Sequence, residues 1–292
     1  MAGKMAAPPK RIVLATDLSG AGDRALDRAT ELAVGWGADL VVVHALDDGG
    51  SGAAQSLPSW RRPPDLAALA EKQIRDDIRG PSPRLSIHID EGRPLNVILE
   101  AVEREQADLL IVGMGRGNAF DGLSRTVDEL FRRCPVSMLV VKTRPNAPYG
   151  RILVGTDYSD EARCGLEVAA KLFPSTVMTL MHAYDMAYRN LYLDPALAER
   201  FSRVEKETIA AWLDQADLSD TDRTRIHPLI EHGAPEVMLS AFAREQGADL
   251  TVVGAYERSR LFHMAVGGSG PRIVQSAPSD VLVVRADRTA LA

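Results

Sequence analysis

Two glycine-containing stretches of the sequence have residue types that suit phosphate binding. Residues 248–271 run from an apolar segment, through Gly254 and a polar stretch, to Gly267-Gly268-Ser269-Gly270-Pro271. Residues 107–126 repeat this order. Proline in a first helical turn, with serine just before it, is typical of a helix start, where free N–H groups and the helix dipole attract anions. The pattern predicts a phosphate cradle, but a plain strand-to-helix turn also needs glycine for its positive φ angles, and both readings stay open.

The apolar segments that lead into these stretches indicate buried parallel strands. Leu250–Val253 is β-branched at three of four positions, and Leu109–Val112 is its counterpart. Further matches recur at offsets between 138 and 143 residues, which indicates an internal duplication. The matched pairs are Arg11–Ser19 with Arg151–Ser159, Val42–Ala45 with Leu180–Ala183, Gly92–Pro94 with Gly233–Pro235, Arg104–Leu109 with Arg244–Leu250, and Pro135–Lys142 with Pro278–Arg285.

Between the strands the apolar period becomes helical. Four apolar faces are expected: Ala25, Leu26, Ala29, Leu32 and Ala33; Leu95, Ile98, Leu99 and Val102; Ala162, Leu166, Ala169, Ala170 and Phe173; and Val237, Met238, Ala241 and Phe242. A long helix is predicted from Pro195 to about Leu213. Each half therefore alternates strands and helices, which predicts an α/β fold with a mainly parallel sheet and helices on both faces.

The totals fit a protein of two ordinary domains. The 292 residues are 46% hydrophobic and 25% charged, with a net charge of −6 that argues against a nucleic-acid partner. No apolar run reaches membrane-spanning length, no secretory segment is visible, and the two cysteines form no disulfide framework, so a cytoplasmic location is expected. We expect a tail over 1–10, domains over 11–143 and 151–286, and a linker over 144–150.

These motifs resemble those of a tandem universal stress protein, and the resemblance covers nearly all of both halves. It implies two similar doubly wound domains, each with a five-stranded parallel sheet in the order 3-2-1-4-5. In that order the topological switch point falls between strands 1 and 4. Asp157 and Gly254, far apart in sequence, would then meet at one crevice, as would Asp17 and Gly113.

The resemblance also implies an adenine nucleotide, ATP with or without Mg²⁺, as the ligand. Nucleotide-binding members carry Gly, two residues, Gly, nine residues, then Gly and Ser or Thr, and neither half has this motif intact. In the second half Gly254, Gly267, Gly268 and Ser269 fit, but Glu257 replaces a glycine and would repel phosphate unless it turned outward or held a cation.

In the first half Gly113 and Gly115 stand one residue too close, and Arg125 replaces the last glycine before Thr126. The charges of Arg116 and Arg125 could compensate for these departures. Thr126 with Glu129 is equally a helix capping box that needs no ligand, so both interpretations are kept.

Other residues are placed by the same resemblance. Thr156 and Asp157, with Asp17 in the first half, would contact ribose or base; an aspartate here could equally hold an Asx turn or a helix cap. Ala45 and Ala183 would offer backbone contacts to the adenine. The adjacent His44 and His182 have no Cys, His or carboxylate cluster beside them in sequence, so no metal site is predicted.

The leading hypothesis is a stress-response protein that binds an adenine nucleotide and acts as a nucleotide-dependent regulatory module. The alternative is a family member that has lost this site and works through protein partners or another small ligand. No catalytic motif is present, so at most slow ATP hydrolysis is expected. By resemblance, the last strands, Met138–Val141 and Val281–Val284, would pair to give an intramolecular pseudo-dimer, and a homodimer of whole chains stays open.

Overall fold

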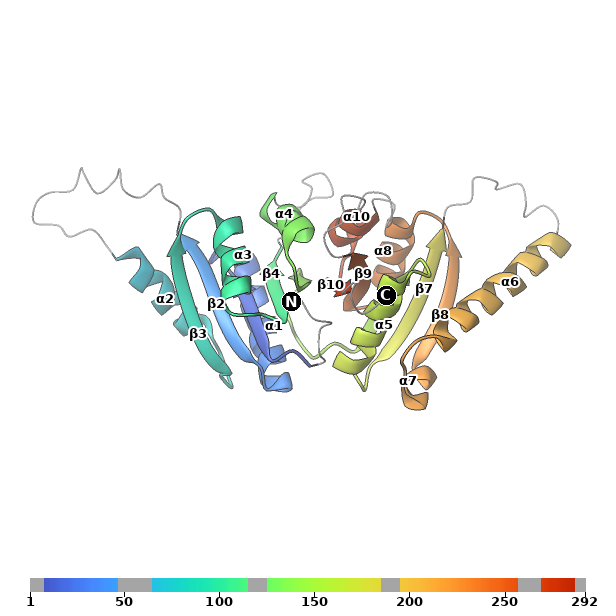
Figure 1. Cartoon of the computed structure of the whole chain (residues 1–292), viewed down its shortest axis with the longest axis horizontal. Helices are drawn as coiled ribbons and strands as arrows, with labels where there is room; N and C mark the ends of the chain where they lie inside the picture. The colour runs from blue at the N-terminus through green and yellow to red at the C-terminus, as the bar shows by residue number, and fades with distance from the viewer. Residues whose placement is uncertain (1–7, 47–64, 115–124, 185–194, 257–268, 287–292) are drawn as a thin grey trace, which may run out of the picture. The chain divides into compact units, whose positions relative to one another are not determined.

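The computed structural model describes residues 8–46, 65–114, 125–184, 195–256 and 269–286. The chain divides into two compact units, which we call the N-terminal unit (Pro8–Pro148) and the C-terminal unit (from Tyr149 onward). Both consist of parallel strands with helices packed against them (Figure 1). The division at Pro148 falls within the expected linker, whose two ends pack with different units.

The N-terminal unit has five parallel strands in the order β3-β2-β1-β4-β5. This matches the order that the family resemblance implied. Its strands are β1 (Arg11–Ala15), β2 (Asp39–Leu46), β3 (Arg84–Glu91), β4 (Leu109–Gly113) and β5 (Ser137–Val141). Its helices are α1 (Gly20–Trp36), α2 (Leu66–Asp77), α3 (Pro94–Arg104) and α4 (Arg125–Arg133).

The C-terminal unit repeats this sheet in the order β8-β7-β6-β9-β10. Its strands are β6 (Arg151–Thr156), β7 (Val177–Tyr184), β8 (Ile226–His232), β9 (Leu250–Tyr256) and β10 (Asp280–Ala286). Its helices are α5 (Asp160–Leu172), α6 (Pro195–Asp214), α7 (Asp220–Thr224), α8 (Pro235–Gln246) and α10 (Ser269–Ser276). The long helix expected from Pro195 is confirmed and ends one residue beyond the expected Leu213.

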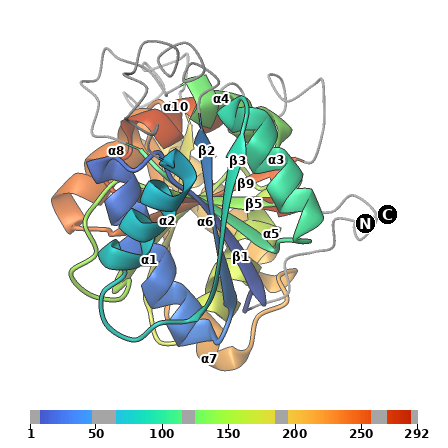
Figure 2. The same cartoon turned by 90° about the vertical axis from the view of Figure 1, so that its left-hand side faces the viewer.

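Helices cover both faces of each sheet. In the N-terminal unit α1 and α2 lie on one side of β1–β3, and α3 lies on the other (Figure 2). The central strands are buried on both faces: Ile12, Val13 and Leu14 have no exposed surface. Strands covered on both faces read as continuous apolar runs, and this is why the sequence pattern identified them correctly.

Most of the expected helix faces are buried, but one is wrong. All five apolar residues expected on α1 are buried. On α8, however, Val237 is 54% exposed, and the buried residues are Leu239, Ser240 and Ala243. The hydroxyl oxygen of Ser240 lies within hydrogen-bond distance of Glu236 O and of Ser276 Oγ on α10, at 2.6 and 2.7 Å. Packing against α10 thus turns α8 away from the orientation that its apolar residues alone predict.

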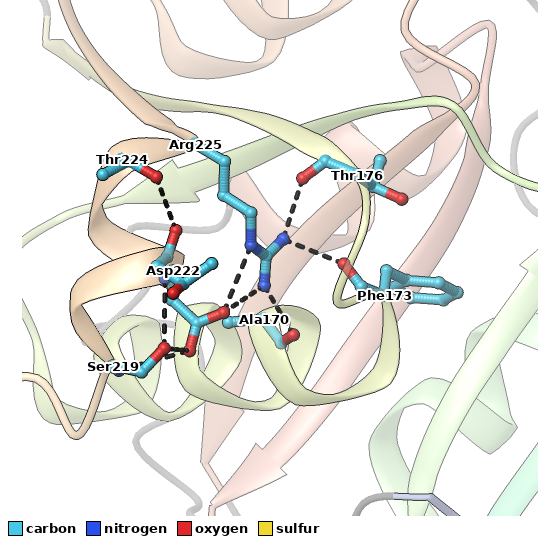
Figure 3. A network of polar contacts seen from close by, with 8 residues as sticks. Ala170, Phe173, Thr176, Ser219, Asp222, Thr224 and Arg225 are labelled. Carbon is cyan, nitrogen blue, oxygen red and sulfur yellow. Dashed lines mark hydrogen bonds and ion pairs between the residues drawn. The ribbon is translucent and has the colours of Figure 1, made fainter.

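An arginine network joins the end of α5 to the segment between α7 and β8 (Figure 3). The guanidinium of Arg225, just before β8, donates to the carbonyls of Ala170, Phe173 and Thr176 at 2.7–2.8 Å. It also pairs with Asp222, which closes a capping box with Ser219 at the start of α7. The cation thus satisfies carbonyl groups that the end of α5 leaves without helical partners.

The expected linker packs against its neighbours on both sides of the division. In the N-terminal unit Arg28 donates to Ala147 O at 3.1 Å. In the C-terminal unit the Tyr149 hydroxyl donates to the buried Asp280 carboxylate at 2.7 Å, and Tyr149 O accepts from Thr176. Pairing of the two last strands, across the units, stays a prediction.

Candidate functional site

The central strand of the N-terminal unit ends in a polar turn at the carboxyl edge of the sheet. Thr16 Oγ1 accepts from Leu18 N at 3.1 Å, and Asp17 Oδ1 accepts from Ser19 N at 3.0 Å. Leu18 has a φ of 58°, a left-handed conformation that is uncommon for leucine. Ser19 then caps α1 by accepting from Ala21 N and Gly22 N. Asp17 therefore holds an Asx-type turn, while its side chain stays exposed.

The C-terminal unit repeats this turn with nearly the same geometry. Thr156 Oγ1 accepts from Tyr158 N, and Asp157 Oδ1 accepts from Ser159 N, both at 3.0 Å. Tyr158 has a φ of 64° and Ser159 caps α5. Left-handed backbone at non-glycine residues costs free energy and often marks functional sites. Here both units carry it at the topological switch point, with an exposed aspartate beside it.

A glycine at or near the end of the fourth strand of each unit, Gly113 or Gly254, lies against the first turn of the helix that follows the central strand. A Cβ on Gly113 would lie 2.3 Å from Ala21 O, and one on Gly254 would lie 2.2 Å from Glu161 O. Neither position can hold a side chain, because the obstacle is backbone. Both glycines are therefore required for packing whether or not a ligand is present.

The second strand of each unit brings a histidine to the same edge. Nδ1 of His44 lies 2.9 Å from Thr16 O, and Nδ1 of His182 lies 2.8 Å from Thr156 O. Because a carbonyl can only accept, Nδ1 carries the hydrogen in both rings. The next residues, Ala45 and Ala183, extend beyond the last residues that pair with the central strand. The candidate positions on the first, second and fourth strands thus gather at one edge of each sheet.

The predicted phosphate loops are described only at their ends. Gly115, Arg116, Gly267 and Gly268 lie outside the described residues, and Ser269 is the first residue of α10. Thr126 is the second residue of α4, and Glu129 accepts from Arg125 at 3.0 Å. The capping-box interpretation of Thr126 and Glu129 is therefore wrong, because Thr126 does not precede the helix and Glu129 pairs with Arg125.

A column of rings follows the turn in the C-terminal unit, and the sequence did not predict it. We call Trp212, Tyr158, His182, Tyr184 and His232 the ring column. Tyr158 stacks on His182 with centroids 4.1 Å apart, and His182 stacks on Tyr184 at 5.2 Å. The pKa of Tyr158 is raised to about 12, mainly by burial and secondly by the nearby Glu205 carboxylate, so its hydroxyl stays protonated.

One sequence signal could have indicated the column. His182 and Tyr184 occupy alternate positions of a strand and so share a face. The duplicated half has Leu18 and Leu46 at the positions of Tyr158 and Tyr184. A change from aliphatic to aromatic at two matched positions marks a difference between the units, although which rings meet is a property of the folded chain.

Metal and membrane sites find no support in the parts of the chain that are described. Within 8–46, 65–114, 125–184, 195–256 and 269–286, no three His, Cys, Asp or Glu side chains gather to hold a metal. None of the helices in those ranges is both long and apolar enough to cross a bilayer.

Comparison with known proteins identifies the family. The model of the universal stress protein family matches residues 8–142 and again 148–285. Universal stress protein E of Photorhabdus laumondii is 24% identical over 214 residues, covering 67% of each chain. This chain therefore belongs to the universal stress protein family of stress-response proteins, as a tandem member.

Solved structures show the same fold over most of the chain. A universal stress protein from Archaeoglobus fulgidus matches with a TM-score of 0.64 and 18% identity, over 94% of this chain and 98% of that one. A protein of unknown function from Pseudomonas aeruginosa PAO1 matches with a TM-score of 0.62 and 20% identity, over 96% and 94%. At these identities the likeness shows a shared fold.

Proposed function

We propose that this chain binds an adenine nucleotide at the carboxyl edge of its C-terminal unit and acts as a nucleotide-dependent regulatory module. The observation that carries the proposal is the turn after β6. It presents the exposed Asp157 at the switch point, after a strand that pairs with β7, which carries His182, and with β9, which carries Gly254. Crevices at switch points are where open α/β sheets bind ligands.

The residues of this edge suit the base and ribose of a nucleotide. A carboxylate such as Asp157 accepts hydrogen bonds from ribose hydroxyls or an amino group of a base. Thr156, just before it, pairs with His182, the residue that precedes Ala183. The triphosphate would fall to the residues before α10, where the helix N-terminus favours negative charge. Mg²⁺, when bound with ATP, would neutralise phosphate charge near Glu257.

A second candidate, a chain that has lost nucleotide binding and acts through partners, is favoured by two observations. Gly113 and Gly254 have a packing role against α1 and α5, and both aspartates have a role in their own turns. Each residue is thus explained without a ligand. The two candidates differ in whether the exposed carboxylate of Asp157 contacts a bound nucleotide in solution.

Calorimetric titration of nucleotide-stripped protein with ATP and Mg²⁺ tests the proposal. We expect saturable binding that Gly267→Asp abolishes, because it adds a carboxylate to the phosphate loop. Asp157→Asn keeps the acceptor for Ser159 N but removes the charge, and should weaken binding about tenfold, the effect of losing a charged hydrogen bond.

The matched variant Asp17→Asn is the control for the N-terminal unit and should leave the affinity unchanged. If Asp17→Asn weakens binding and Asp157→Asn does not, the site lies in the N-terminal unit. An absence of heat and of thermal stabilisation at millimolar ATP, where a bound ligand must raise the melting temperature by mass action, would favour the partner-binding candidate.

A further inference from the structure

The ring column of the C-terminal unit runs from the core to the surface. Trp212, on α6, is 5% exposed. Tyr158, His182 and Tyr184 are half-buried, and His232, at the end of β8, is exposed. Tyr184 lies edge-to-face with His232, their centroids 4.8 Å apart. The column is therefore anchored in the core at one end and reaches solvent at the other.

The fold does not require the two tyrosines of the ring column. In the N-terminal unit the register that pairs Tyr184 with His232 instead pairs Leu46 with Glu91. Leu18 stands in place of Tyr158, and the turn around it keeps the same hydrogen bonds. The N-terminal unit thus forms the same architecture with leucine at two of these positions, so the fold does not depend on Tyr158 and Tyr184.

Two polar groups of the column have no hydrogen-bond partner within the described part of the chain. Tyr158 Oη and Trp212 Nε1 are buried, and neither has a hydrogen-bond partner among the residues that the structure describes. A buried donor without a partner costs free energy that leucine at the same place would not.

The column is attached directly to the proposed nucleotide site. Tyr158 follows Asp157 in the turn, and the His182 ring donates to Thr156 O at 2.8 Å. Tyr184 follows Ala183, the residue proposed to lie beside the base. A base held at this edge would thus meet the exposed part of the Tyr184 ring, whose inner neighbour His182 fixes its orientation.

We infer that Tyr184 stacks against the base of the bound nucleotide and makes the C-terminal unit selective for purine nucleotides. Aromatic side chains stack on any base face, and the two fused rings of a purine overlap more of the tyrosine than a single pyrimidine ring does. The inference rests on the proposed function and deepens it, because it names a residue that selects the base.

The test compares Tyr184→Leu, the residue of the N-terminal unit, with Tyr184→Phe, which keeps the ring. ATP, CTP and inorganic tripolyphosphate are titrated into the full chain, with Mg²⁺, and thermal melting checks that each variant is folded. Tyr184→Leu should weaken ATP binding about tenfold, as the loss of one stacked ring does, and remove the preference for ATP over CTP. Tripolyphosphate binding should be unchanged, and Tyr184→Phe should behave as the unsubstituted chain.

Two results would overturn the inference while leaving nucleotide binding in place. In one, Tyr184→Leu leaves the ATP affinity and the preference over CTP intact. In the other, ATP and tripolyphosphate weaken together, which would mean that the ring only supports the turn. If the unsubstituted chain binds no ATP at all, the proposed function fails first, and the inference falls with it.

Discussion

The first helix of each unit ends in a different way. In the N-terminal unit α1 is closed by Gly37, whose φ of 67° lets its N–H and that of Ala38 reach carbonyls of the last turn. In the C-terminal unit α5 ends at Leu172 with Phe173 as its C-cap, and Arg225 supplies the donors instead. The matched arginine, Arg84, is 80% exposed and pairs with Asp39, whereas Arg225 is 10% exposed.

This difference shows how a duplicated fold diverges. The sheet order and the turn after the central strand are the same in both units, because they set the architecture. The residues that close α1 and α5, and those beside the turns, have changed, because several local solutions satisfy the same backbone groups. Some differences between the units, such as that between Arg225 and Arg84, are alternative structural solutions. For the difference between Tyr184 and Leu46 we propose a role in ligand binding.

The largest expected effect concerns a feature that the units share. Gly254→Ala places a Cβ against Glu161 O, and because backbone must move, we expect a loss of about 3 kcal/mol or more of unfolding free energy. Gly22→Ala is the control: its Cβ would meet the Thr16 side chain, and the C-terminal unit holds Ala162 at that position. Urea unfolding should show a small change for Gly22→Ala; equal losses would contradict the packing role.

The arginine comparison should give an intermediate effect. Arg225→Ala leaves three carbonyls and the Asp222 carboxylate without their cation, so a loss of about 2 kcal/mol is expected. Arg84→Ala removes an exposed pair and should cost less than about 0.5 kcal/mol. An equal shift in melting temperature for both variants would contradict the expectation that Arg225 contributes more to stability than Arg84.

The smallest effects are expected from two aspartates with opposite pKa shifts. Burial alone would raise the pKa of Asp222, but bonds from Ser219 and Arg225 hold it below its ordinary value of 3.8. The pKa of Asp23 is raised from 3.8, by burial and then by the nearby Asp77 and Asp27 carboxylates. Ionised Asp222 thus stabilises the fold above pH 3.8. This stabilisation is lost as the pH falls through the lower pKa that Asp222 has in the folded state. Ionised Asp23 destabilises the fold at neutral pH, and that cost disappears below pH 3.8.

Asparagine substitutions distinguish the stabilising carboxylate of Asp222 from the destabilising one of Asp23. At pH 7, Asp222→Asn should lower the unfolding free energy by about 1 kcal/mol. Asp23 is exposed and screened by solvent, so Asp23→Asn should raise the unfolding free energy by less than about 0.5 kcal/mol. Urea unfolding repeated at strongly acidic pH should show both differences shrink. Changes of the same sign at pH 7 would be inconsistent with the opposite surroundings of the two carboxylates.

The sequence by itself determined the duplication, the family, the α/β class and most strand and helix positions. Buried strands are continuous apolar runs, and helix faces such as that of α1 repeat every three to four residues, so local composition records their burial. The motif pairs also placed Asp17 and Asp157 at the ends of the central strands. These are properties of segments, which one stretch of chain can encode.

Only the tertiary structure decided which residues meet. The rotation of α8 depends on α10, and the role of Gly254 depends on the first turn of α5. The ring column joins four elements, and Arg225 reaches carbonyls about fifty residues earlier in the chain. Such contacts depend on how helices settle on the sheet, where packing outweighs the preference of any single segment.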